Sequence, residues 1–61
     1  MNYREEIKKM TKTIPMSVVE GGVMQAGLWK EKAINALQIA SNPRATTVEL
    51  LRAYEEMKRF R

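Results

Sequence analysis

The chain has 61 residues, and eleven Lys and Arg against seven Asp and Glu give it a net charge of +4 at pH 7. Its length predicts one small domain with a thin core. Because it contains no Cys and no His, it lacks an imidazole base, a thiol nucleophile and the usual zinc ligands. We therefore predict a protein that is not an enzyme and that needs no metal or cofactor.

Helical spacing predicts the first helix. An apolar residue recurs every three or four positions from Tyr3 to Ile14. Asn2 can cap the start of this helix, and Pro15 disfavours helical geometry in the residue before it. The first helix is therefore expected over about residues 2–12.

Three glycines follow a second helix start. Residues 17–20 read SVVE, a capping-box pattern, and predict a helix over about 18–26. The pair Gly21-Gly22 falls inside this helix, either as a kink or as a place where another helix backbone comes close. Gly27 stands where a left-handed residue would end the helix.

The last two helices are predicted over about 29–41 and 47–60. Apolar residues recur at helical spacing through the third helix, and its many alanines indicate a close helical neighbour. Asn42-Pro43 predicts the turn that follows. A second capping-box pattern, TTVE at residues 46–49, marks the start of the fourth helix.

The segment Val19–Gln38 resembles the helix-turn-helix units of small bacterial and phage regulators. Counted from Val19, Gly27 occupies the ninth position, where that family has a glycine in its turn. Apolar residues stand where the family packs its two helices together, at Ala26, Leu28, Ala33 and Ala36. The expected fold is an all-α domain spanning 1–61, a small bundle of three or four short helices containing a helix-turn-helix-like pair.

The resemblance implies a regulator that binds duplex DNA in the major groove. Amides and cations match base edges, and further cations contact phosphates. The expected groove-facing residues are Lys30, Asn35 and Gln38, and the expected phosphate contacts are Lys32, Arg44, Arg52, Lys58, Arg59 and Arg61. The same residues also fit a solvated surface, and the C-terminal cations also compensate a helix dipole.

A protein-docking module is the alternative. Five methionines in 61 residues is high usage, and Met adapts well to binding surfaces. The expected interface anchors are Trp29, Tyr54, Met57 and Phe60. By analogy with small phage and mobile-element proteins, the partner would be a larger DNA-acting enzyme, and the chain its inhibitor or a recombination directionality factor. A homodimer is left open, although no heptad run argues for one.

The chain carries no sign of a membrane or secretory segment. Its apolar runs are far shorter than the ~20 residues that span a bilayer, and its N-terminus lacks the apolar core of a signal peptide. We expect a cytoplasmic protein, complete from its initiator Met and without a membrane partner.

Overall fold

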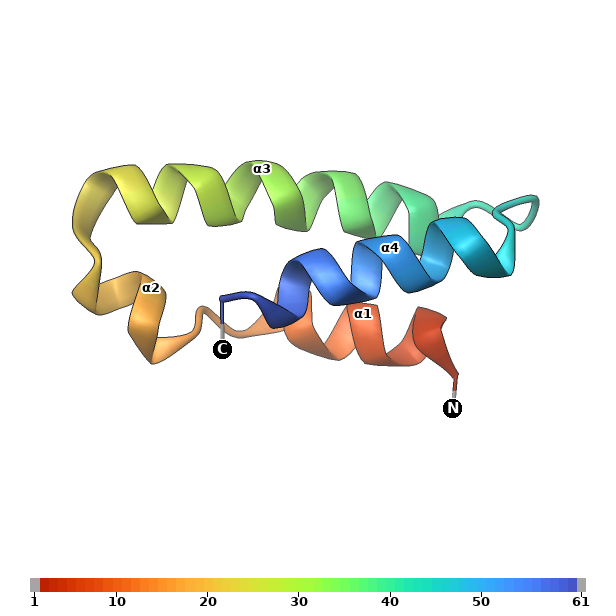
Figure 1. The fold of residues 1–61 in the computed structure, drawn as a ribbon, viewed down its shortest axis with the longest axis horizontal. Helices are drawn as coiled ribbons and strands as arrows, with labels where there is room; N and C mark the ends of the chain where they lie inside the picture. Colours follow the sequence, from red (N-terminus) through yellow and green to blue (C-terminus); the bar gives the residue numbers. More distant parts are fainter. Residues whose placement is uncertain (1, 61) are drawn as a thin grey trace.

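The computed structural model describes residues 2–60, which form an all-α bundle without strands in that range. The helices are α1 (Tyr3–Lys12), α2 (Met16–Glu20), α3 (Gly22–Ser41) and α4 (Thr47–Lys58). In Figure 1, α1 and α4 run in the same direction and α3 runs against both. These three helices pack on one another, and the short α2 packs on α3. The predicted small all-α bundle is confirmed.

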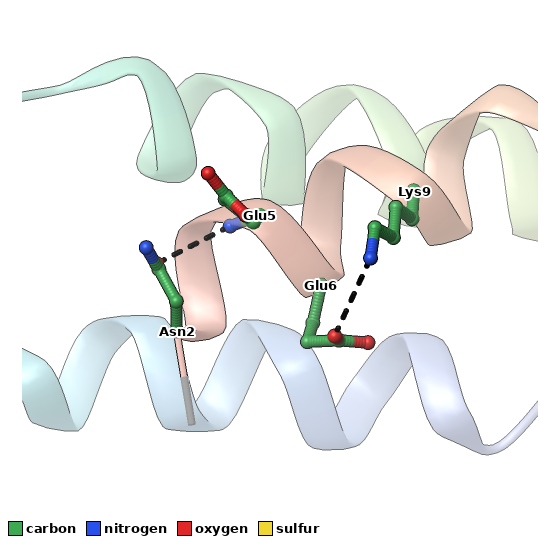
Figure 2. Close-up of polar contacts among 4 residues, drawn as sticks. All are labelled: Asn2, Glu5, Glu6 and Lys9. Carbon is green, nitrogen blue, oxygen red and sulfur yellow. Dashed lines mark hydrogen bonds and ion pairs between the residues drawn. The ribbon is translucent and has the colours of Figure 1, made fainter.

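Local signals in the sequence set the bounds of α1. The side chain of Asn2 accepts a hydrogen bond from the Glu5 backbone N–H at 3.4 Å, and Glu6 lies 4.0 Å from the ammonium of Lys9 (Figure 2). Acidic residues in the first turn and basic residues in the last oppose the helix dipole. The capped helix ends at Lys12, as the sequence predicts.

The second helix starts earlier and ends sooner than predicted. Pro15 is the N-cap of α2, so Ser17 lies inside the helix and does not cap it. The Ser17 hydroxyl instead donates a hydrogen bond to the backbone carbonyl of Phe60, which ties α2 to the end of α4. The helix stops at Glu20 because the next two residues form a corner.

The predicted break at Gly27 is wrong. Gly22 has a φ of 81°, a conformation that a residue with a side chain rarely adopts, so the chain turns at Gly21-Gly22. Gly27 lies inside α3, which runs without a break from Gly22 to Ser41 and so joins the second part of the predicted helix 18–26 to the predicted helix 29–41. A glycine in a helix costs only about 1 kcal/mol, and the packed face of α3 outweighs that cost. The predicted helix-turn-helix-like pair around Gly27 is therefore one helix.

The core is thin and uses small residues where helices meet. One face of α3 buries Trp29 and three alanines, spaced so that they lie in one stripe. The other helices supply larger side chains, and those with almost no exposure are Ile7, Val18 and Met57. Alanine on α3 lets α1 and α4 approach closely, as its abundance predicts. Leu37, which lies on α3 next to Ala36, is outside the buried stripe and is 42% exposed.

The connection between α3 and α4 is held from α1. Within the turn, the Asn42 side chain accepts a hydrogen bond from the Arg44 backbone N–H at 2.9 Å. From α1, the Arg4 guanidinium donates to the carbonyls of Ala40 at 3.0 Å and Asn42 at 2.7 Å. It also reaches the carbonyls of Pro43 and Ala45 at 3.5 and 3.4 Å. A single side chain thus fixes the end of α3 against α1.

The capping box that starts α4 is confirmed. The Thr46 hydroxyl oxygen accepts from the Glu49 backbone N–H at 3.2 Å, and the Glu49 carboxylate accepts from the Thr46 backbone N–H at 3.4 Å. The helix ends at Lys58, two residues before the predicted end.

Candidate functional site

The residues on α3 that were predicted to contact DNA, through bases or phosphates, do not share one face. Lys30 and Lys32 are two positions apart, which separates them by about 200° around a helix. The Lys32 ammonium lies 3.6 Å from the Glu56 carboxylate on α4. Asn35 and Gln38 are exposed and three positions apart, so they lie on the same side of α3. The structure therefore turns the two lysines in nearly opposite directions.

The residues predicted to contact phosphates are spread along the molecule. Arg44 lies in the turn between α3 and α4, while Lys58 and Arg59 lie at the other end of α4 (Figure 1). Arg52 and Arg59 are exposed and seven positions apart, which places them on one side of that helix. Arg61 lies outside the described residues. No single cationic surface brings these residues together with Lys30.

The residues predicted as interface anchors belong to the core. Trp29 and Met57 are buried, at 9% and 1% exposure, and Tyr54 and Phe60 are half-buried and pack against them. The Tyr54 ring lies 5.2 Å from the ring of Tyr3, at an angle of 50°. The largest side chains of the protein therefore pack in or against the core. An exposed docking surface has to be made of other residues.

Such a surface lies where α2 meets the start of α3. In Figure 1, the first turns of α3 extend past α1 and α4, with α2 beneath them. Five large apolar side chains here are at least half exposed: Met16 at 70%, Val19 at 61%, Val23 at 91%, Met24 at 84% and Leu28 at 50%. We call these five residues the apolar end. None of these five residues is among the interface anchors predicted from the sequence.

The apolar end is also nearly free of charge. Glu20 is the one charged residue between Lys12 and Lys30. A partner that covers this surface would therefore desolvate few charged groups. Desolvation of charged groups is the main free-energy cost of burying a polar surface. The sequence itself shows this stretch with a single charged residue, and that pattern could have indicated the site.

Two further features lie beside the apolar end. A surface hollow of about 370 Å³ is lined by Thr13, Pro15, Met16 and Ser17. The indole Nε1 of Trp29, which follows Leu28, is buried without a hydrogen-bond acceptor among the described residues. An unpaired buried donor costs about 1–3 kcal/mol. This end of the bundle thus carries both exposed apolar surface and an unsatisfied polar atom.

Metal ligands and membrane spans are not found in residues 2–60. No group of three or more acidic, His or Cys side chains in this range lies close enough to hold a metal ion. No helix in the same range combines the length and the apolar character needed to cross a bilayer.

No protein-family model, curated protein or solved structure matches the chain. What the chain does is therefore inferred from its surface.

Proposed function

We propose that this chain is a non-enzymatic docking protein that binds a larger protein through the apolar end. The observation that carries the proposal is the balance of apolar side chains among the described residues. Nine large apolar side chains are at least 42% exposed, whereas six are buried. Large exposed apolar side chains gathered at one end of a small domain mark a binding site, and five of the nine belong to the apolar end.

The energy available at the apolar end suits a protein partner. Fully burying one large apolar side chain contributes about 1.5–3 kcal/mol, and the five residues of the apolar end start at least half exposed. Covering them releases roughly 5–10 kcal/mol. That gain is needed to offset the cost of association, which is about 4–15 kcal/mol before other contacts are counted. The partner therefore has to add polar or apolar contacts around the rim.

The net charge of +4 narrows the class of partner. Outside the apolar end, the cationic surplus favours a protein with an acidic surface or one that already holds nucleic acid. A larger DNA-acting enzyme in the cytoplasm, which the chain would inhibit or redirect, fits both conditions. The proposed partner is therefore a larger DNA-acting enzyme.

Direct binding of duplex DNA is the second candidate, and one observation favours it. Arg52 and Arg59 are exposed on the same side of α4. However, Glu55 and Glu56 lie between them in the sequence and lower the positive potential there. DNA binding is therefore placed second.

A capture experiment with matched variants tests the docking proposal. Immobilised chain is exposed to a lysate, and bound proteins are identified after crosslinking through residues near the apolar end. Leu28→Lys and Met16→Lys place charges in the apolar end and should abolish capture. Val48→Lys is the control, because Val48 is 59% exposed on α4, away from the apolar end. Capture that survives the first two variants, with circular dichroism showing an intact fold, would rule the apolar end out.

A parallel titration tests the DNA candidate. Duplex affinity is measured across a salt series for the natural sequence and for Arg52→Ala, Lys30→Ala and Asn35→Ala. Direct binding requires a steep loss of affinity with salt, and a shallower slope once a phosphate-contacting arginine is removed. Weak binding that does not respond to Arg52→Ala would rule out direct binding of duplex DNA.

A further inference from the structure

A second surface on α3 carries a pattern that is complementary to itself. Gly27, Lys30, Glu31 and Ile34 stand at positions i, i+3, i+4 and i+7, so they share one face of the helix. We call these four residues the outer face. All four are exposed, and the outer face points away from the buried stripe that contains Trp29.

The charges on the outer face have no ion-pair partner among residues 2–60. Among residues 2–60 the ion pairs join Lys9 to Glu6 and Lys32 to Glu56, and neither involves Lys30 or Glu31. One cation and one anion therefore stand side by side at the centre of the outer face. A surface of this kind attracts a copy of itself that is turned end for end.

The uncharged members of the outer face have matching shapes. A Cβ atom added to Gly27 would meet nothing within 4 Å, so the helix backbone is bare there. Ile34 is 50% exposed and projects from the same face. Gly27 precedes Lys30 by three residues, and Ile34 follows Glu31 by three. In an antiparallel pair, the spacing that joins Lys30 to the partner's Glu31 also places Ile34 over the partner's Gly27.

The register also matches the length of the helix. Because α3 runs from Gly22 to Ser41, its midpoint lies next to Lys30 and Glu31. A two-fold axis between these two residues therefore overlaps the paired helices along almost their whole length. Antiparallel helices also oppose their dipoles, which adds to the attraction.

The surface area of the monomer is consistent with a missing contact. A folded monomer of this mass is expected to expose about 4,100 Å², and the chain exposes 4601 Å². The excess is roughly 500 Å², close to the ~600 Å² per copy that a small specific interface covers. The outer face thus has the charges and the shape for a symmetric contact, on a monomer that exposes more surface than its mass predicts.

We propose that α3 pairs antiparallel with α3 of a second copy of the chain, with Lys30 against the partner's Glu31 and Ile34 packed on the partner's Gly27. This pairing shares Val23 with the apolar end, because Val23 lies four residues before Gly27 on the same side of α3, but it does not use Met16 or Leu28, which the docking test changes. Each proposal can therefore fail while the other holds.

Charge exchange tests both the pairing and its register. Sedimentation velocity is measured from about 10 μM to about 1 mM chain, where a contact of this size associates. Lys30→Glu alone and Glu31→Lys alone each replace two attractions with two repulsions, and each should weaken the dimer about tenfold. The double variant Lys30→Glu/Glu31→Lys restores both attractions and should dimerise like the natural sequence. An equimolar mixture of the two single variants should form heterodimers.

Gly27→Gln supplies a test of shape. Glutamine is a good helix former and has open space around it in the monomer, so helix content should be kept or raised while the dimer dissociates. A chain that stays monomeric over the whole range would overturn the proposal. So would a dimer that tolerates Gly27→Gln, or one whose single charge variants show no rescue in the mixture or in the double variant. Circular dichroism of each variant shows that loss of the dimer is not loss of the fold.

Discussion

The four hydrogen bonds from Arg4 make a prediction about stability that the sequence does not suggest. The guanidinium holds the last carbonyls of α3 and the turn after it, which would otherwise lack partners at a helix end. Arg4→Met keeps an unbranched apolar stem and removes the charge and the donors of all four hydrogen bonds. The carbonyls of Ala40 and Asn42 would then have to be satisfied by water.

The size of the effect follows from the distances. Two of the bonds, at 3.0 and 2.7 Å, are short, and the bonds at 3.5 and 3.4 Å are long and weak. A hydrogen bond to a charged group contributes about 1.5–3 kcal/mol, and the partial exposure of Arg4 lowers that figure. We expect Arg4→Met to cost about 2–3 kcal/mol, which for a domain of this size lowers Tm by roughly 10–20 °C. Arg4→Lys should fall in between, because one ammonium cannot reach four carbonyls.

Thermal and urea unfolding followed by circular dichroism measure this loss. Lys8→Met is the matched control, because Lys8 lies on the same helix, is exposed and makes no ion pair within residues 2–60. It should change stability by less than about 0.5 kcal/mol. If Arg4→Met and Lys8→Met unfold at the same temperature, the hydrogen bonds of Arg4 do not stabilise the bundle and the reasoning fails.

Three further predictions concern the glycines, the cap of α4 and the surface ion pair. Gly22→Ala should destabilise the fold by about 1–2 kcal/mol, because φ is 81° at this residue. Gly27→Ala should instead stabilise the monomer by about 0.5–1 kcal/mol, because Gly27 lies inside a helix. Urea unfolding of dilute protein compares the two variants, and equal effects would contradict the chain turn assigned to Gly21-Gly22. Thr46→Ala should lower the free energy of unfolding by about 0.5–2 kcal/mol, because it removes the capping box. Thr47→Ala is the control and should not lower the free energy of unfolding to the same extent in the same assay. Lys32→Ala should cost less than about 1 kcal/mol, because its ion pair with Glu56 is exposed, and a larger loss in thermal unfolding would show that this contact is stronger than its exposure indicates.

The parts of the fold that depend on neighbouring residues were predictable. Apolar spacing and the Asn2 cap gave α1, and the Thr46–Glu49 capping box gave the start of α4. Each of these signals lies within a few residues of the structure that it specifies. The sequence alone therefore places the first and last helices within about two residues.

The errors arose where distant residues decide the outcome. Three glycines lie close together, and local propensity does not show which of them takes a positive φ. Packing of the face that starts at Trp29 keeps α3 helical through Gly27 and moves the corner to Gly22. The role of Arg4 was invisible because its acceptors lie 36 to 41 residues away.

The candidate site was missed for a related reason. The periodicity of the sequence identifies the apolar face of each helix. It does not show which part of that face no other helix will cover. Aromatic side chains such as Trp29 and Tyr54 were expected as anchors because of their chemistry, yet a thin core needs its largest side chains most. The apolar end is therefore made of valine, leucine and methionine, on α2 and on the first turns of α3, which extend past α1 and α4.

The long-range hydrogen bonds of Arg4, a clasp between α1 and the α3–α4 turn, also indicate the order in which the bundle assembles. The α3–α4 hairpin closes through a turn of five residues, from Asn42 to Thr46, whereas α1 must find carbonyls about 40 residues away. Because closing a long loop costs more entropy than closing a short one, we expect the hairpin to form first and α1 to dock last. Loss of the clasp would then speed unfolding and leave the refolding rate nearly unchanged. Arg4 thus governs the lifetime of the folded state more than the speed of reaching it.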